Sequence, residues 1–305
     1  MPPPQHDDRT NASAKLLLVL LSLTWGVTWP AIRIALREIP PFSMRTVSLA
    51  LGAAFLLAAV ALQRRTFALG RPIDWLHVAI ASVLNIIGFT MLSSFALLMA
   101  ATSRVTILSY TMPIWAALFA RLALGERLSR AALIALALCV AGMAVLIAPL
   151  AQDGIPPGLL LAVATGMSWA AGTVYIKWAQ IHGDPIAVAA WQLTIGFLIV
   201  AIGVPFVEGV PHFADAHWPA WLATIWVGIA GSGFAYFLWF KIIGRLPAMT
   251  ASLGLLSVPL IGVAATFLIL GERPTLPDIV GFVLIFAAAA CVLLSSREAA
   301  PPEPS

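Results

Sequence analysis

Three tryptophans inside apolar runs are the residues best suited to hold a ring-bearing solute. Trp25 and Trp29 share the first run, and Trp169 lies in a later one. An indole offers a broad face for stacking or cation–π contact, and an N–H donor for a carboxylate or carbonyl. Tryptophan also packs against lipid and at membrane interfaces. We predict that all three line a substrate site, with helix packing as the alternative.

Polar side chains within the same kind of run could complete that site. Tyr110 and Tyr236 are two of three tyrosines, and Asn85 is the one asparagine inside such a run, with Thr90 close by. A phenol or amide deep in lipid needs a partner. The partner could be a solute, another helix or, for a hydroxyl, a carbonyl of its own helix. We predict that these four residues contact the solute.

Two prolines interrupt apolar runs at related places. Pro113 and Pro259 lack an N–H, and the ring clashes with the carbonyl four residues earlier, so each should bend its helix. The bend could be a static kink. We predict instead that both prolines are hinges.

The absent residue types exclude several chemistries. No Asp or Glu lies in the middle of an apolar run, so a cationic drug would find no counter-charge. Too few Lys and Arg residues lie close to these runs to bind the phosphate group of a phosphorylated solute. Cys139 and Cys291 have no metal-ligand spacing, and no HExxH or GxSxG frame is present. We therefore expect no enzyme activity, no metal and no cofactor.

The elements that position these residues must be membrane helices. Apolar residues make up 61% of the 305-residue chain and charged residues only 10%, with a mean hydropathy of +0.98. A soluble fold could not keep so much apolar surface from water. This composition excludes a cytosolic enzyme, a nucleic-acid binder and a secreted disulfide protein. Barrel strands would alternate in polarity, and these runs do not. Ten helical spans are predicted, at 15–36, 40–62, 74–98, 104–124, 130–149, 157–179, 185–207, 218–240, 247–270 and 275–295.

The basic residues indicate an orientation. If the N-terminus is cytoplasmic, most of the 17 Lys and Arg residues fall on the cytoplasmic side. We predict that both tails, 1–14 and 296–305, are cytoplasmic.

An internal repeat divides the chain. In 108–129 and in 254–275 a proline precedes a Gly-Glu-Arg turn by the same interval, ending at Glu126 and Glu272. Trp25 and Trp169 also correspond, because each is followed by a proline, Pro41 or Pro185, at the same spacing. The predicted halves are 15–149 and 157–295, with five spans each. Because five is odd, the second half is inverted, an arrangement typical of secondary transporters with a site near the midplane.

The ten spans, the tryptophan of the first helix and the paired proline and Gly-Glu-Arg motifs resemble the drug/metabolite transporter superfamily. The chain is most similar to its EamA-type exporters, and within them to the aromatic amino-acid exporters of the YddG type. The resemblance implies two inverted five-helix repeats around a central cavity lined by spans 1, 3, 4, 6, 8 and 9, in a bacterial inner membrane.

The residues and the resemblance together predict a secondary transporter that exports neutral amino acids, aromatic or large and apolar, by alternating access. We expect facilitative transport, because no carboxylate titrates in mid-span and His77, the one histidine in a span, lies near its end. The alternatives are a multidrug or nucleotide-sugar carrier, an intramembrane enzyme and a receptor. The expected partners are the solute and the bilayer, with no nucleic acid and no obligate protein partner.

Overall fold

The computed structural model describes residues 6–125, 130–149, 156–210, 215–243 and 256–295, and no strand occurs within these ranges. Eight helical stretches there are long and apolar enough to cross a membrane. Two shorter apolar helices, Ser257–Leu270 and Leu276–Cys291, accompany them. The molecule is an all-helical membrane protein of ten spans, as predicted.

The first five spans occupy residues 6–147. The third and fourth are each divided, the third by a π-helical segment, η1, and the fourth by a short turn. The helices are α1 His6–Ala35, α2 Pro41–Leu62, α3 Pro72–Ala81, η1 Ser82–Gly88, α4 Phe89–Met99, α5 Thr102–Ser109, α6 Met112–Leu124 and α7 Arg130–Ile147.

Among the described residues of the last five spans, the eighth span again contains a π-helical segment, η4. The helices are α8 Pro157–Ala179, α9 Pro185–Val207, α10 Trp218–Ile225, η4 Trp226–Phe234, α11 Ala235–Ile243, α13 Ser257–Leu270 and α14 Leu276–Ser295.

Local sequence explains where these helices begin and end. Proline stands in the first turn of α2, α3, α8, α9 and α10, where its missing N–H costs no helical bond. The Asp184 carboxylate accepts from the N–H groups of Ile186 and Ala187 and so caps α9. Gly125 and Gly271 end α6 and α13 at φ values of 70° and 71°, a left-handed conformation that favours glycine. These glycines open the two Gly-Glu-Arg turns.

Helix α1 begins at His6, and its apolar part long enough to span the membrane is Leu16–Ala35, close to the predicted 15–36. The break expected near 98–104 is present at Ala100, which is extended. The structure differs from the prediction in the fourth span. The predicted span 104–124 is two helices with Tyr110 and Thr111 between them. The first Glu of the repeated turn, Glu126, the stretch 247–255 and the tail 296–305 lie outside the described residues.

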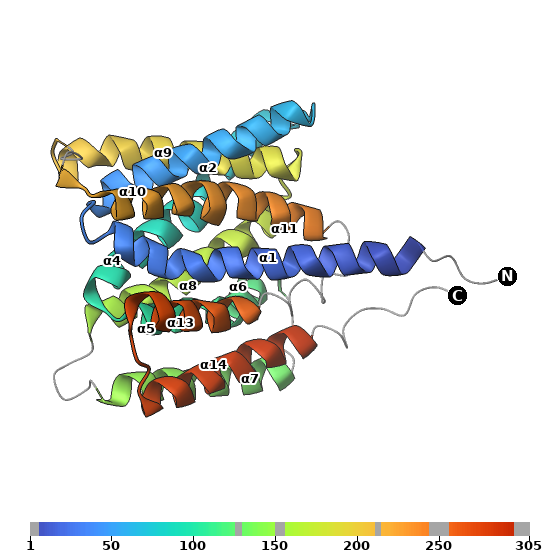
Figure 1. Cartoon of the computed structure of the whole chain (residues 1–305). Helices are drawn as coiled ribbons and strands as arrows, with labels where there is room; N and C mark the ends of the chain where they lie inside the picture. Colours follow the sequence, from blue (N-terminus) through green and yellow to red (C-terminus); the bar gives the residue numbers. More distant parts are fainter. Residues whose placement is uncertain (1–5, 126–129, 150–155, 211–214, 244–255, 296–305) are drawn as a thin grey trace, which may run out of the picture.

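Helices from corresponding places in the two halves pack on each other. Helix α2 packs along α9 and α7 along α14, as Figure 1 shows at opposite sides of the bundle. Helix α1 packs on α13, and α8 packs on α4, α5 and α6. The first span thus meets the ninth and the sixth meets the fourth. The predicted domain boundaries themselves remain a prediction.

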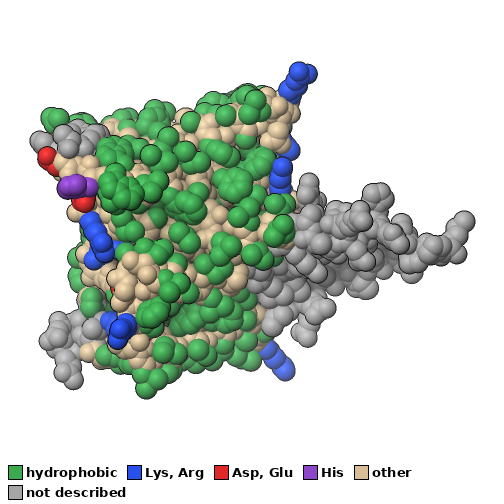
Figure 2. Space-filling view, viewed as in Figure 1, with side chains coloured by type: hydrophobic (Ala, Val, Ile, Leu, Met, Phe, Trp, Pro, Cys, Tyr) green, Lys and Arg blue, Asp and Glu red, His purple; other side chains and the backbone are tan. Residues whose placement is uncertain are grey.

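The surface has the polarity of a membrane protein. Figure 2 shows hydrophobic side chains over the middle of the visible face, with charged side chains gathered at its two edges. Large apolar residues such as Leu122, Phe206 and Leu268 are strongly exposed on their helices. Such a band would be an aggregation surface in water and is expected in lipid.

Candidate functional site

Six aromatic rings from five parts of the chain meet in the interior and form what we call the ring cluster. Its centre is Trp169 of α8. The Trp169 ring centroid lies 5.1 Å from that of Phe89 on α4 and 6.3 Å from that of Tyr236 on α11. Such offset and edge contacts are favourable for aromatic pairs. The complete cluster is Trp25, Trp29, Phe89, Tyr110, Trp169 and Tyr236.

Helix α1 supplies the other two indoles. Trp29 lies 6.2 Å from Phe89 and 6.4 Å from Tyr110, between ring centroids. Trp25 lies 6.3 Å from Tyr236, and its Nε1–H donates to the carbonyl of Gly231 at 3.0 Å. The structure therefore brings five of the seven predicted substrate residues together. Trp29 is only 5% exposed, and the other five rings are partly buried.

Phe89 joins the two sides of the cluster and is the residue that sequence reasoning missed. It contacts both Trp29 and Trp169. The chain has 15 phenylalanines, mostly in apolar runs, and nothing in its own sequence neighbourhood distinguishes Phe89. Only its position four residues after Asn85 and one before Thr90 could have drawn attention to it.

Asn85 lies just outside the ring cluster on the π-helical segment η1. It is 7% exposed, and its Oδ1 has no hydrogen-bond partner among the described residues. A Cβ on Gly172 of α8 would lie 2.1 Å from that oxygen, so the amide packs directly on bare backbone. A buried acceptor without a donor costs about 1–3 kcal/mol. Asn85 therefore presents an unused acceptor next to the cluster.

Thr90 is not brought to the rings by any contact among the described residues. Its hydroxyl donates to the Ile86 carbonyl of its own helix at 2.6 Å. Its carbonyl accepts from the hydroxyls of Ser93 and Ser94 at 3.0 and 2.8 Å. The local bond satisfies the Thr90 hydroxyl, and its predicted role in binding stays a prediction.

The two prolines start helices instead of bending them. Pro113 is the second residue of α6, directly after the turn at Tyr110 and Thr111. Pro259 is the third residue of α13. Both sit in a first turn, where the missing donor is tolerated. The break before Pro113 rests on α8, because a Cβ on Gly166 would lie 2.8 Å from the carbonyl oxygen of Ser109.

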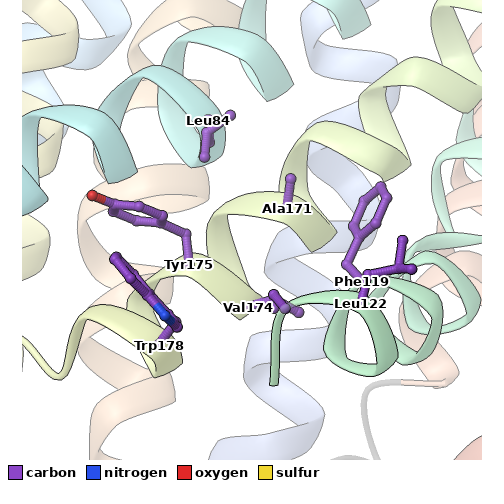
Figure 3. Close-up of a pocket in the computed structure, with 8 residues that line it drawn as sticks. Leu84, Phe119, Leu122, Ala171, Val174, Tyr175 and Trp178 are labelled. Carbon is purple, nitrogen blue, oxygen red and sulfur yellow. The ribbon is translucent and has the colours of Figure 1, made fainter. Parts of the chain in front are cut away.

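A pocket of about 480 Å³ opens between η1, α6 and α8 (Figure 3). Four of its residues follow Trp169 along α8, and Figure 3 shows Tyr175 and Trp178 on one side of the view and Phe119 and Leu122 on the other. Its apolar lining suits the hydrophobic body of a small ligand. On sequence alone, these side chains cannot be told from lipid-facing ones. They are Leu84, Phe119, Leu122, Ala123, Ala171, Val174, Tyr175 and Trp178.

His77 borders this pocket through Tyr175. Its Nδ1 and the Tyr175 hydroxyl are hydrogen-bonded at 2.8 Å, which joins α3 to α8. Its ring also contacts Trp178, with centroids 6.1 Å apart. The imidazole is thus part of a contact between the two halves.

Near the end of α1 and the start of α2, carboxylates of one half accept hydrogen bonds from backbone N–H groups of the other half. We call this region the Glu208 end. Glu208 accepts from the N–H groups of Phe42 and Ser43 at 2.7 and 2.9 Å. Glu38 accepts from the N–H of His217 at 2.6 Å, and this bond holds the pKa of the Glu38 carboxyl below its usual value. Both bonds satisfy helix N-termini of the opposite half.

Glu272, from the second Gly-Glu-Arg turn, does the same for α5. Its carboxylate accepts from the N–H groups of Thr102 and Ser103 at 3.0 and 3.1 Å. Arg104 pairs with Asp278 at 2.6 Å in the same region. The second copy of the motif therefore does more than form a turn: its carboxylate joins the second half to the first.

Buried apolar packing also closes the Glu208 end. A cluster including Ile32, Leu36, Met44, Leu97 and Leu108 fills it, each side chain at most 7% exposed. The pocket of Figure 3 lies toward the end of the bundle that is opposite the Glu208 end, near the C-terminal ends of α6 and α8. The structure is thus tightly packed at the Glu208 end, and the pocket lies toward the other ends of the membrane helices.

Comparisons with known proteins agree with this architecture. A transporter of Bacillus subtilis named YvbV is 30% identical over 285 residues, covering 92% of each chain. A Salmonella typhimurium protein named "Probable amino-acid metabolite efflux pump" is 27% identical over 283 residues, 89% of this chain and 91% of its own. One solved crystal structure has the same fold, with a TM-score of 0.65 and 23% identity over 95% of this chain and 98% of the other.

The family model described as the EamA-like transporter family matches twice, over residues 12–148 and 156–294. Together the two matches span nearly all ten helices. This is a family of transporters rather than enzymes, and the all-helical membrane fold fits that role. The chain belongs to the EamA-like transporter family and is a multi-pass membrane transporter.

Proposed function

We propose that the chain exports neutral amino acids with aromatic or large apolar side chains across the bacterial inner membrane. The ring cluster carries this proposal, because indole and phenol faces from both halves meet at one place. A solute ring that replaces these mutual contacts keeps comparable stacking energy. The relative named as an amino-acid metabolite efflux pump supports the same solute class.

The polar groups around the cluster suit the rest of such a solute. The unused Oδ1 of Asn85 can accept from an ammonium group. The Nε1–H of Trp25, now bonded to Gly231, can donate to a carboxylate when the helices shift. Thr90 and the carbonyls near the α5–α6 break offer further partners. Translocation needs no covalent step.

Alternating access follows from the uneven packing. We assign both termini to the cytoplasm, so that the Glu208 end faces outward and the pocket of Figure 3 opens toward the cytoplasmic side. This is an outward-closed state. Separation of the halves at the Glu208 end, with loss of the cross-half bonds of Glu38, Glu208 and Glu272, would expose the cluster to the other side.

Purified protein in sealed liposomes tests the proposal by counterflow of labelled phenylalanine, tryptophan, glutamate and putrescine. We expect exchange of the first two only. We also expect flux to follow the solute gradient and to be unchanged by a protonophore, because the described residues include no Asp or Glu in the middle of a span. Exchange of putrescine or of glutamate alone would refute the solute class. Uphill uptake that a protonophore abolishes would refute facilitative transport and point to His77.

The break at Pro113 is proposed as a hinge, with Pro259 as its counterpart. Pro113→Ala restores an N–H and removes the ring, so α5 and α6 can join. We expect turnover to fall about fivefold while the half-saturating concentration stays within about twofold, because motion rather than contact is lost. Counterflow rates over a range of phenylalanine concentrations measure both. A large rise in half-saturating concentration with unchanged turnover would mean that the proline shapes the site.

A further inference from the structure

Helix α2 buries a guanidinium group that has no carboxylate partner. Arg45 is 3% exposed. Its Nε donates to the hydroxyl of Ser94 at 2.7 Å and its Nη2 to that of Ser93 at 3.2 Å, both on α4. Among the described residues, no ion pair joins Arg45 to an Asp or Glu. Burying a charge without a counter-ion is costly, so this arrangement requires a reason.

The contrast with Arg104 shows that the chain can supply counter-ions. Arg104 forms an ion pair with the carboxylate of Asp278. The two serines that hold Arg45 are neutral and already donate to the Thr90 carbonyl, so their lone pairs orient the guanidinium without neutralising it. The two serines thus fix the position of the Arg45 guanidinium, and no carboxylate among the described residues pairs with its positive charge.

The face of α2 that carries Arg45 also packs on the second half, although the guanidinium itself bonds α4 of the first half. Ser48, three residues later on the same helix face, lies against η4, since a Cβ on Gly228 would be 2.7 Å from its carbonyl oxygen. Gly52 continues that face, where a Cβ would lie 2.9 Å from the Cβ of Ser232. Parting of the halves would therefore uncover this face of α2.

The ring cluster is close to the guanidinium. Ser93 follows Phe89 by four residues on α4, one turn nearer the Glu208 end. Phe89 in turn contacts Trp29 and Trp169. A solute that leaves the rings toward the Glu208 end would pass beside Arg45.

We infer that Arg45, oriented by Ser93 and Ser94, binds the carboxylate of the solute on the Glu208 side of the ring cluster. A guanidinium fork matches a carboxylate in a two-point contact, and the carboxylate supplies the missing counter-charge. This inference rests on the proposed function and adds a contact that favours solutes with a carboxylate without being needed for exchange. Asn85 lies eight residues before Ser93, up to about 12 Å away along the helix. The two groups therefore serve successive positions of one solute rather than its two charges at once.

The test compares phenylalanine with phenylalaninamide, which keeps the ring and the amine but lacks the carboxylate. Counterflow is measured for wild type, Arg45→Gln, Arg45→Lys and the exposed control Arg121→Gln. We expect Arg45→Gln to lower phenylalanine exchange by about tenfold or more, the usual effect of losing a charged hydrogen bond. Phenylalaninamide exchange should change by less than about twofold. Arg45→Lys should keep part of the phenylalanine exchange, and Arg121→Gln all of it.

Equal loss of both solutes in Arg45→Gln, or no loss of either, would overturn the inference. If Arg45→Gln does not fold, Arg45→Lys decides: a loss confined to phenylalanine supports a carboxylate contact, and an equal loss of both overturns it.

Stabilisation of the detergent-solubilised protein by phenylacetate, with phenylacetamide as control, needs no transport. We expect a rise in Tm with phenylacetate alone in wild type, and none in Arg45→Gln or, if that variant does not fold, a smaller rise in Arg45→Lys. If wild type exchanges no amino acid, the proposed function fails, and this shift still decides whether a carboxylate site exists. Absence of the shift in wild type would overturn the inference as well.

Discussion

Trp169→Ala is expected to lower phenylalanine exchange about tenfold or more, whereas Trp218→Ala should leave it within about twofold. Trp169 is the ring that joins Phe89 to Tyr236, with centroids at 5.1 and 6.3 Å. Its removal deletes the contact surface at the centre of the proposed site. Trp218 starts α10 and is 74% exposed, so its loss removes no interior contact.

Initial rates of counterflow, normalised to the amount of reconstituted protein, provide the measurement. Trp25→Ala serves as a third variant, because Trp25 reaches Tyr236 from α1 and donates to Gly231 of η4. We expect it to impair exchange as Trp169→Ala does. Equal rates in all three variants would show that the ring cluster is helix packing and would remove the basis of the proposed solute class.

Much of the fold follows from the sequence because lipid simplifies the problem. The predicted spans 157–179 and 185–207 coincide with α8 and α9. Each begins at a proline, and Asp184 caps the second. Apolar length and this punctuation are enough when every backbone group must be satisfied inside a helix. The family resemblance placed Trp25, Trp29, Tyr110, Trp169 and Tyr236 in spans that line a cavity, and the structure brings their rings together.

Features that depend on contacts between distant segments were not predictable. The π-helical segments η1 and η4 stand at corresponding places in the third and eighth spans, and no residue pattern marks either one. The role of Glu272 depends on α5, some 170 residues earlier in the chain. The sequence shows Arg45 only as a single charge near the start of a predicted span, yet its side chain is buried between helices. The place of Arg45 follows from how α2 meets α4, and the role of Glu272 from how the two halves meet.

That meeting predicts the second large effect: Gly26→Leu and Gly166→Leu should each abolish most of the folded protein. Helix α1 crosses α13 at Gly26, where a Cβ would lie 2.5 Å from Ile261 Cγ2 and 3.1 Å from the Gly262 nitrogen. Helix α8 crosses the α5–α6 break at Gly166, where a Cβ would meet the Ser109 carbonyl oxygen at 2.8 Å. Backbone cannot yield as a side chain does, so a leucine must push the helices apart at a cost of about 3 kcal/mol or more.

These two crossings join the first span to the ninth and the sixth to the fourth. Because they are equivalent under the repeat, we expect both glycine variants to lose folded protein to a similar extent. Ala54→Leu is the matched control, because Ala54 is exposed on α2 and the added side chain meets lipid. Size-exclusion profiles in detergent and unfolding midpoints measure the outcome. Failure of one glycine variant alone would mean that one crossing carries the fold and the other is tolerant. Failure of both, with Ala54→Leu intact, would show that the close approach of these paired helices holds the two halves together.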